Sequence, residues 1–442
     1  MSGDLCAAAE SGLPPQFNGS VIYDEAGLTT LEMRQKTVNK KIVIVSALRT
    51  PFDKYGGVTK DIRSIELGAA VLKNVVERVD FPKDKVDYIF YGTTIHAEIA
   101  LDVNVPVRQA LLHAGFPSTT LSLTVDRACC ASMAAFTEAV REIQAGEAEV
   151  VIAAGAENLS HVPFLLDGAR WGNRLGKMEL QDVNAGFNYP GFGLVSVDTE
   201  SVAAREGISR EDMDRWSYRT QMRYQEANKA GKFNEEIVPL PVHTQKGDVV
   251  LAEDQSPRAD TTYEKLASLK AVYGTKTITA GNAPALNSGA SAILMMTREK
   301  AEEYGLKPLA YVKDAVAVAS DYENIPTVPA LAIKKLLKRN QMNPRDLDLI
   351  EINEAFAAMP LVSTKLVADG DPELTEALRD ITNVNGGAVA IGHPMGATGC
   401  RLIMTLMYEL RRRGGGTGIA CLCGGLAQGD GVMIEVPGDN VN

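Results

Sequence analysis

The stretch "LTVDRACCASMAAF", residues 123–136, passes from the pattern of a β-strand directly into that of an α-helix. Leucine, threonine and valine favour the strand. After Cys129 large apolar residues recur at the spacing of one helix face, at Met133, Phe136, Val140 and Ile143, before a stop at Gly146. A strand that leads into a helix without a long loop is the unit of α/β folds. The stretch therefore predicts an α/β protein.

Short apolar runs of the same kind recur along the chain and alternate with helical patterns. They cover residues 41–48, 86–92, 120–125, 148–155, 347–353, 419–423 and 431–436. Because these runs are apolar on both faces, they predict buried strands of an α/β sheet. The order strand, turn, helix, strand occurs between residues 41 and 157 and again between residues 310 and 436, which predicts an internal duplication.

The segment between the two copies has a different character. Residues 158–275 hold both tryptophans, many charges and an amphipathic helical pattern at residues 209–231. We therefore expect a loop domain inserted between the halves. The predicted organisation is an N-terminal extension, an N-terminal half completed later in the chain, the loop domain and a C-terminal half: residues 1–40, 41–157 with 276–300, 158–275 and 301–442.

Charge and composition exclude several classes of partner. Lysine plus arginine number 45 against 56 acidic residues, and no basic run resembles a nucleic-acid arm, so nucleic acid is not an expected partner. No segment reaches the roughly 20 apolar residues of a membrane span. The N-terminus lacks the patterns of secretory and transit peptides, which predicts a cytoplasmic protein. The six cysteines suit neither a disulfide scaffold nor a metal site, so we expect reduced thiols and no metal.

Two residues lie where a strand or a glycine-rich turn leads into a helix. Cys129 is at the start of the predicted helix, where unpaired backbone N–H groups and the positive helix end favour a thiolate. His393 lies in "GGAVAIGHPMGATG", residues 386–399, whose glycines let the backbone approach a ligand closely. A plain buried cysteine and a structural histidine are the alternatives.

Two further strand ends carry polar groups. In "CLCGGLAQGDG" the thiols of Cys421 and Cys423 precede Gly424 and a second glycine, whose backbone N–H groups are suited to an oxyanion nest. Asn353 leaves another strand just before a helix. Because α/β sheets present their active sites at such strand ends, we expect two thiols, an imidazole and an amide to meet in one site.

These motifs, in their order along the chain, resemble those of the thiolases, the acyl-CoA:acetyl-CoA acyltransferases. The resemblance covers roughly residues 41–436. It rests on "VSALRTPFDKYGG", "VDRACCAS", "AGAENLS", "TITAGNAPALNSGASA", "NEAFA", "NVNGGAVAIGHPMGATG" and "CLCGG". It implies a duplicated five-layer αβαβα fold with an inserted loop domain, and a homodimer or homotetramer.

The resemblance also implies the chemistry. Cys129 would match the nucleophile that takes the acyl group as a thioester, and His393 the base that removes its proton. Cys421 would match the second cysteine, which moves a proton at the acetyl α-carbon. Asn353 would hold a water that, with His393, binds the thioester oxygen, and the backbone N–H groups of Cys129 and Cys423 would bind the other oxyanion. Coenzyme A (CoA) and acyl-CoA are then substrates, and no other cofactor is implied.

The sequence departs from the family pattern in places. Cys130 is an alternative nucleophile, and the long glycine-rich segment after Cys421 makes Cys423 the alternative second thiol. Pro284 stands where many thiolases have a serine that contacts CoA, and "LVSVDTES" replaces a frequent motif of the acyl pocket.

The activity also has alternatives. The reaction is either cleavage of 3-oxoacyl-CoA, as in β-oxidation of fatty acids, or condensation of acetyl-CoA. A 3-oxoacyl carrier-protein synthase would lack the second catalytic cysteine. A non-catalytic thiolase-like protein that binds acyl-CoA or lipid, or that acts as a scaffold, is the alternative from another class.

Overall fold

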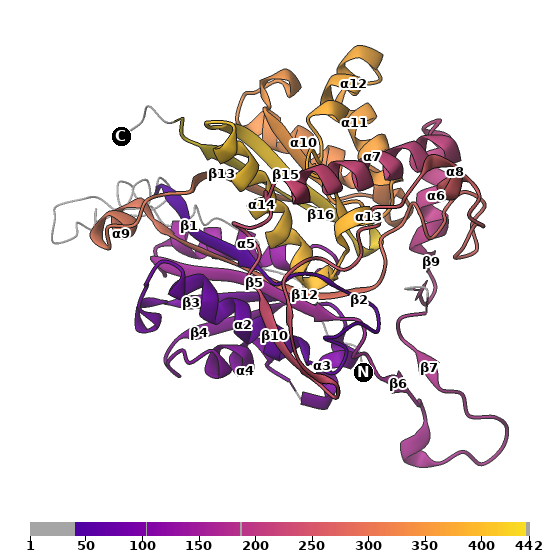
Figure 1. Cartoon of the computed structure of the whole chain (residues 1–442), viewed down its shortest axis with the longest axis horizontal. Helices are drawn as coiled ribbons and strands as arrows, with labels where there is room; N and C mark the ends of the chain where they lie inside the picture. The colour runs from indigo at the N-terminus through magenta and orange to yellow at the C-terminus, as the bar shows by residue number, and fades with distance from the viewer. Residues whose placement is uncertain (1–39, 103, 186–187, 439–442) are drawn as a thin grey trace, which may run out of the picture. The chain divides into compact units, whose positions relative to one another are not determined.

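The computed structural model describes residues 40–102, 104–185 and 188–438 (Figure 1). The contacts divide the chain at Lys40, and the rest forms one compact unit. The extension predicted for residues 1–40 lies outside the described residues apart from Lys40.

The centre of the unit is a ten-stranded sheet with the strand order β14-β15-β16-β13-β1-β12-β5-β3-β4, and β2 pairs with β12. The two halves of this sheet meet where the start of β1 pairs with the start of β13. The strands are β1 (Ile42–Arg49), β2 (Asp53–Lys54), β3 (Tyr88–Gly92), β4 (Leu121–Val125), β5 (Val150–Asn158), β12 (Asn287–Thr297), β13 (Ala310–Ala319), β14 (Leu349–Ile352), β15 (Gly416–Gly424) and β16 (Gln428–Val436).

Strand pairing is the same in both halves. β3 runs parallel to β5 as β14 runs parallel to β15. β12 pairs antiparallel with β5 and β1, as β16 does with β15 and β13. A single parallel bridge between Ile350 and Thr382 stands where β4 flanks β3 in the first half. The internal duplication predicted from the sequence is confirmed.

The helices form three layers around the two halves of the sheet. Helices α5 (Ala131–Ala145) and α14 (Met395–Arg412) share one apolar core with strands of both halves, so they lie between them. Helices α2 (Ser64–Glu77) and α4 (Pro106–His113) cover the other face of the N-terminal half. Helices α10 (Val328–Arg339) and α12 (Pro372–Asp380) do so for the C-terminal half, with the end of α11 (Ala358–Val367). The predicted five-layer αβαβα order is confirmed.

The chain between β5 and β12 lies outside the sheet. Its main helix, α7 (Arg210–Lys229), lies within the helical pattern predicted at residues 209–231 and begins with a capping box in which Ser209 accepts a hydrogen bond from the backbone of Asp212. The other elements here are α6 (Val195–Arg205), α7 (Arg210–Lys229), α8 (Tyr263–Ala267) and the hairpins β6 (Phe164–Leu165) with β7 (Gln181–Asp182), β8 (Asn188–Tyr189) with β9 (Gly193–Leu194), and β10 (Leu240–Thr244) with β11 (Gly247–Leu251). The remaining short helices are α3 (His96–Ile99), α9 (Arg298–Glu303) and α13 (Ala388–Ile391).

One expectation about these elements is incomplete and a second is wrong. The helical pattern "RLIMTLMYELRRR" covers residues 401–413, but α14 begins earlier, at Met395, directly after Pro394. Its first turns contain Gly396 and Gly399, where a Cβ atom would overlap the backbone of β5 and α5 respectively, so close packing explains residues that a propensity pattern excludes. β4 was expected to be buried, yet it is an edge strand with Leu121 59% and Leu123 45% exposed.

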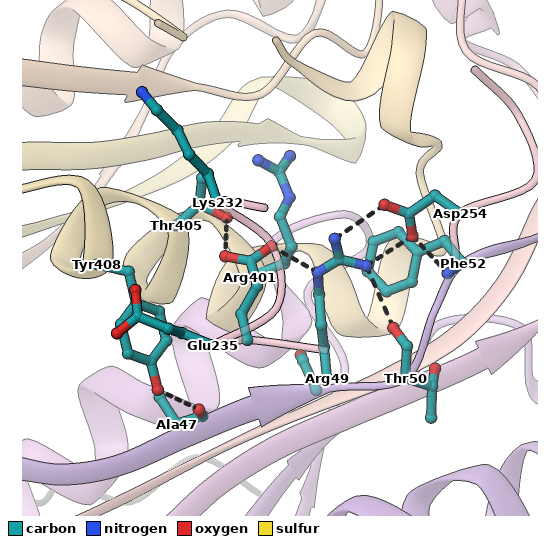
Figure 2. A network of polar contacts seen from close by, with 12 residues as sticks. Ala47, Arg49, Thr50, Phe52, Lys232, Glu235, Asp254, Arg401, Thr405 and Tyr408 are labelled. Atoms are coloured by element: carbon teal, nitrogen blue, oxygen red, sulfur yellow. Dashed lines mark hydrogen bonds and ion pairs between the residues drawn. The ribbon is translucent and has the colours of Figure 1, made fainter. Parts of the chain in front are cut away.

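A buried ion network joins the inserted chain to β1 and α14 (Figure 2). Arg49, at the end of β1, donates to Glu236 at 2.8 Å and to both oxygens of Asp254 at 2.6 and 2.9 Å. From α14, Thr405 donates to the second oxygen of Glu236 at 3.0 Å. Removing one member of a buried ion pair typically costs about 3–5 kcal/mol. The network therefore fixes the helix that begins just after His393.

No helix among the described residues is both long enough and apolar enough to cross a bilayer.

Candidate active site

Strand ends from both halves border one cavity of about 280 Å³. Cys129 follows β4, His393 precedes α14 and Cys423 lies at the end of β15. All three line this cavity, although they are widely separated in the sequence. The duplication thus brings equivalent strand ends of the two halves to the same place.

Cys129 lies in a sharp turn between β4 and α5. Ala128 has a φ of 46°, a left-handed conformation that is strained for a residue with a Cβ atom. Asp126 supports the turn because its Oδ1 accepts the Ala128 N–H at 2.9 Å. Cys130 points the other way, is fully buried, and its thiol faces the carbonyl of Leu422 at 3.7 Å. Cys129, and not Cys130, therefore presents its thiol to the cavity.

The predicted thiolate at Cys129 is wrong for the free protein. Burial raises the pKa of the Cys129 thiol to about 12, although its own backbone N–H acts in the opposite direction. The helix α5 begins only at Ala131, two residues after Cys129. Cys129 is consequently a neutral thiol that needs a base.

His393 lines the same cavity and is the candidate for that base. Burial, with a smaller contribution from the charge of Arg401, lowers the pKa of its imidazole to about 3, so the ring is neutral at physiological pH. Nδ1 lies 2.7 Å from Thr398 Oγ1, and Nε2 lies 3.3 Å from Asn353 Nδ2. The His393 backbone N–H donates to Asn287 Oδ1 at 2.9 Å.

Gly392 lets the backbone before His393 pass close to the side chain of Asn287. Its φ is 108°, and a Cβ atom there would lie 2.6 Å from the side-chain carbon of Asn287. The glycine before the histidine therefore lets the backbone approach the Asn287 side chain, and the predicted close approach to a ligand stays a prediction.

Asn353 is buried at the end of β14, beside His393. Its backbone N–H donates to the carbonyl of Cys421 at 3.1 Å. Its side-chain Oδ1 is buried and has no hydrogen-bond partner within the described part of the chain. A buried acceptor without a protein partner is suited to binding a water molecule or a substrate donor.

Glu354 anchors this strand end. Its carboxylate accepts from Trp216 Nε1 at 2.8 Å, from Asn383 Nδ2 at 2.9 Å and from the backbone of Val389 at 3.1 Å. It does not line the cavity. Glu354 thus connects α7 and α13 to β14 and holds Asn353 in place.

The second thiol of the site is Cys423. Cys421 does not line the cavity and packs instead in the apolar core with Ile352, Ile419 and Met433. Burial, and next the proximity of Cys129, raise the pKa of Cys423 above its usual value. Cys129 is not among the groups that act on the pKa of Cys421. The structure therefore does not bring Cys421 to the predicted site.

The two glycines that follow Cys423 also differ in whether they line the cavity. Gly425 lines the cavity, whereas Gly424, the predicted backbone donor, does not. A Cβ atom at Gly424 would meet the carbonyl of Arg127 at 2.9 Å and the thiol of Cys130 at 3.0 Å, so this glycine permits close packing against the Cys129 turn. Gly425 is therefore the glycine of this pair that borders the cavity.

Comparison with known proteins agrees with this geometry. The family model "Thiolase, N-terminal domain" matches residues 42–299, and "Thiolase, C-terminal domain" matches residues 306–436. The chain belongs to the thiolase family. The resemblance stated from the sequence is confirmed, and with it the assignment as an acyltransferase of the thiolase class.

The alignments with related proteins and with solved structures extend over most of this thiolase. The acetyl-CoA acetyltransferase of Chromobacterium violaceum is 39% identical and spans 90% of this chain and all of its own length. Human mitochondrial 3-ketoacyl-CoA thiolase has a TM-score of 0.84 at 32% identity, covering 90% of this chain and 100% of the human chain. The Bacillus anthracis acetyl-CoA acetyltransferase has a TM-score of 0.84 at 37% identity, covering 90% and 99%.

Several residues of the cavity wall were not found from the sequence of this thiolase. Tyr189, Tyr273, Ile325 and Met395 line the cavity but belong to short hairpins, turns or the helix start that the sequence pattern missed. Val195 and Ser196 also line it, and they belong to the "LVSVDTES" segment that was expected to shape the acyl pocket. Pro284 borders the cavity as well.

A second hollow of about 570 Å³ shares Ala283 and Ala285 with the cavity, so the two are neighbours. Lys54, Arg258 and Lys265 line it. Lys265 is paired with Asp260 at 2.7 Å. Among the described residues, Lys54 and Arg258 are then the cations of this wall without an ion pair.

Proposed function

We propose that this thiolase exchanges acyl groups between CoA thioesters through Cys129, either cleaving 3-oxoacyl-CoA with CoA or condensing two molecules of acetyl-CoA. The observation that carries the proposal is the single cavity lined by Cys129, His393 and Cys423. One thiol can hold the acyl group while the other moves a proton at the α-carbon.

In the first step of condensation, Cys129 attacks the thioester carbonyl and His393 Nε2 takes its proton. The backbone N–H groups of Cys129 and Gly425 stabilise the oxyanion. CoA leaves as its thiolate and takes the proton of Cys423. The acyl group is then on Cys129, His393 is an imidazolium, and Cys423 is a thiolate.

In the second step, the Cys423 thiolate removes a proton from the α-carbon of acetyl-CoA. His393 and a water held by Asn353 stabilise the enolate oxygen, which is the costly charge of this reaction. The enolate attacks the acyl carbon, and Cys129 leaves and recovers its proton from His393. Thiolytic cleavage follows the same steps in reverse.

The test of this proposal is turnover by the purified protein. With acetoacetyl-CoA and free CoA we expect loss of the enolate absorbance and formation of acetyl-CoA. A series of short, medium and long 3-oxoacyl-CoA substrates then shows the chain-length preference. The non-catalytic alternative would replace this proposal if none of them were turned over.

The cationic hollow is suited to the phosphates of CoA. Charge-assisted contacts with phosphate contribute about 1.5–3 kcal/mol each. For Arg258→Ala we expect KM for CoA to rise about tenfold while kcat stays nearly unchanged, because the hollow is separate from the reacting thiols. Lys246→Ala, on the exposed turn between β10 and β11, is the control and should leave KM unchanged. An unchanged KM in Arg258→Ala would place the phosphates elsewhere.

We propose that a second copy of this chain packs against an exposed apolar arm, the segment that contains β6 and β7. The chain around β6 and β7 extends away from the sheet (Figure 1). Its exposed side chains include Trp171 at 87%, Leu175 at 92% and Leu180 at 67%. Exposed apolar clusters of this kind mark interaction surfaces. A homodimer or homotetramer would bury them.

Sedimentation velocity tests the assembly. We expect the wild-type chain to sediment as a dimer or tetramer, and the double variant Trp171→Asp, Leu175→Asp to form a smaller species. Val250→Asp, at another exposed apolar position on β11, is the control and should not change the size. A monomeric wild type, or an arm variant of unchanged size, would contradict the proposal. The cytoplasmic location and a role in β-oxidation stay predictions.

A further inference from the structure

The two ring nitrogens of His393 have different partners. Nδ1 lies 2.7 Å from the hydroxyl of Thr398, and Nε2 lies 3.3 Å from the side-chain amide of Asn353. In a neutral imidazole one nitrogen carries the proton and the other carries the lone pair. The mechanism proposed above requires the lone pair on Nε2, and the inference in this subsection rests on that function.

The hydroxyl of Thr398 has one proton to donate. It lies 2.9 Å from the carbonyl of Pro394, four residues earlier, which is the usual acceptor for a threonine within a helix. If that carbonyl takes the hydroxyl proton, Thr398 Oγ1 is left as an acceptor toward Nδ1. The ring proton then lies on Nδ1.

We propose that Thr398 is the positioning residue that keeps the proton of His393 on Nδ1 and leaves the lone pair on Nε2, as the base that the proposed reaction of Cys129 requires. Thr398 touches neither the cavity nor the reacting atoms, and it is fully buried in the second turn of α14. It acts only through the imidazole.

The alternative tautomer is within reach of the same side chains. Asn353 Oδ1 has no partner in the described part of the chain, so after a flip of the amide it could accept a hydrogen bond from a protonated Nε2. Asn353 by itself therefore accommodates either tautomer. The choice depends on the partner of Nδ1, and that partner is Thr398.

The position of Thr398 is well defined by its surroundings. α14 packs closely on β5 and α5 through Gly396 and Gly399 on either side of Thr398. Arg401, one turn later, is fully buried and pairs with Glu351 at 3.2 Å. Burial, with a smaller contribution from this positive charge, opposes a second proton on His393, so the ring stays neutral and its tautomer matters.

The experiment compares Thr398→Val with Thr398→Ser in the full-length protein. Nuclear magnetic resonance of nitrogen-labelled histidine identifies which ring nitrogen carries the proton, and a His393→Asn variant assigns the signal among the five histidines. We expect a protonated Nδ1 in the wild type and in Thr398→Ser, and a protonated Nε2 in Thr398→Val.

The kinetics should follow the tautomer. In Thr398→Val we expect acylation of Cys129, measured by rapid quench and mass spectrometry, to slow by about 10²-fold or more with KM nearly unchanged, since general bases contribute 10²–10⁴-fold. Thr398→Ser should remain within a few-fold of the wild type. Thermal unfolding of both variants shows whether they fold.

Each outcome decides between the proposals. A wild-type spectrum with the proton on Nε2 would overturn the role of Thr398, whether or not the protein turns over substrate. A Thr398→Val variant with normal tautomer and normal acylation would overturn it as well. If Thr398→Val does not fold, the wild-type and Thr398→Ser spectra still decide the tautomer. Absence of turnover in a wild type with a protonated Nδ1 would count against the proposed function alone.

Discussion

Replacing Cys129 with alanine is expected to lower turnover of 3-oxoacyl-CoA by at least about 10⁴-fold, because no other residue then takes the acyl group. Steady-state thiolysis measures the loss. Mass spectrometry of the intact protein after incubation with acetyl-CoA should show an added acetyl group in the wild type and none in Cys129→Ala.

Cys130→Ala is the matched control for this experiment. Its thiol is fully buried and faces the Leu422 carbonyl rather than the cavity. We expect activity within a few-fold of the wild type and a stability loss of about 1 kcal/mol, typical of a modest core substitution. If Cys130→Ala abolished acetylation and Cys129→Ala retained it, the assignment of the nucleophile would be reversed.

Replacing Cys423 with alanine is expected to slow overall turnover by about 10³-fold, within the range that general acid–base groups contribute. The reason is that the α-carbon of acetyl-CoA then loses the thiolate that removes its proton. Cys129 remains available, so acetyl-CoA should still acylate it. We expect the acetylated enzyme to accumulate in Cys423→Ala, which mass spectrometry would detect.

Cys421→Ala separates this effect from general damage to β15. Cys421 lies on the same strand but packs in the core with Ile352 and Met433. We expect a small loss of stability, of the order of 1 kcal/mol, and nearly normal turnover. The opposite pattern, with Cys421→Ala inactive and Cys423→Ala active, would return the acid–base role to the residue first predicted from the sequence.

The sequence predicted correctly an element whose apolar residues all face one core. α5 was predicted from Met133, Phe136, Val140 and Ile143, and in the structure its core-facing side is formed by these residues. It was a poorer guide at α14, where tight packing through Gly396 and Gly399 replaces helix propensity. It also missed the exposure of β4, because an apolar run looks the same on an edge strand as in the middle of a sheet.

The candidate site was predicted in type but not in detail. A cysteine, a histidine, an asparagine and a second cysteine were expected together; Cys129 and His393 line one cavity, and Asn353 lies beside His393 without lining that cavity. The choice between Cys421 and Cys423 could not be made from the sequence, because both thiols lie on one face of β15 and only the end of that strand reaches the cavity.

By itself, the sequence determined the strand and helix order, the duplication and the family, because these depend on residue periodicity and on motifs that are local in the chain. Only the tertiary structure decided which thiols share a cavity, that Cys129 and His393 are neutral in the free protein, and which residue holds each ring nitrogen of His393. Desolvation and hydrogen bonding at a site depend on groups that come together only when both halves fold.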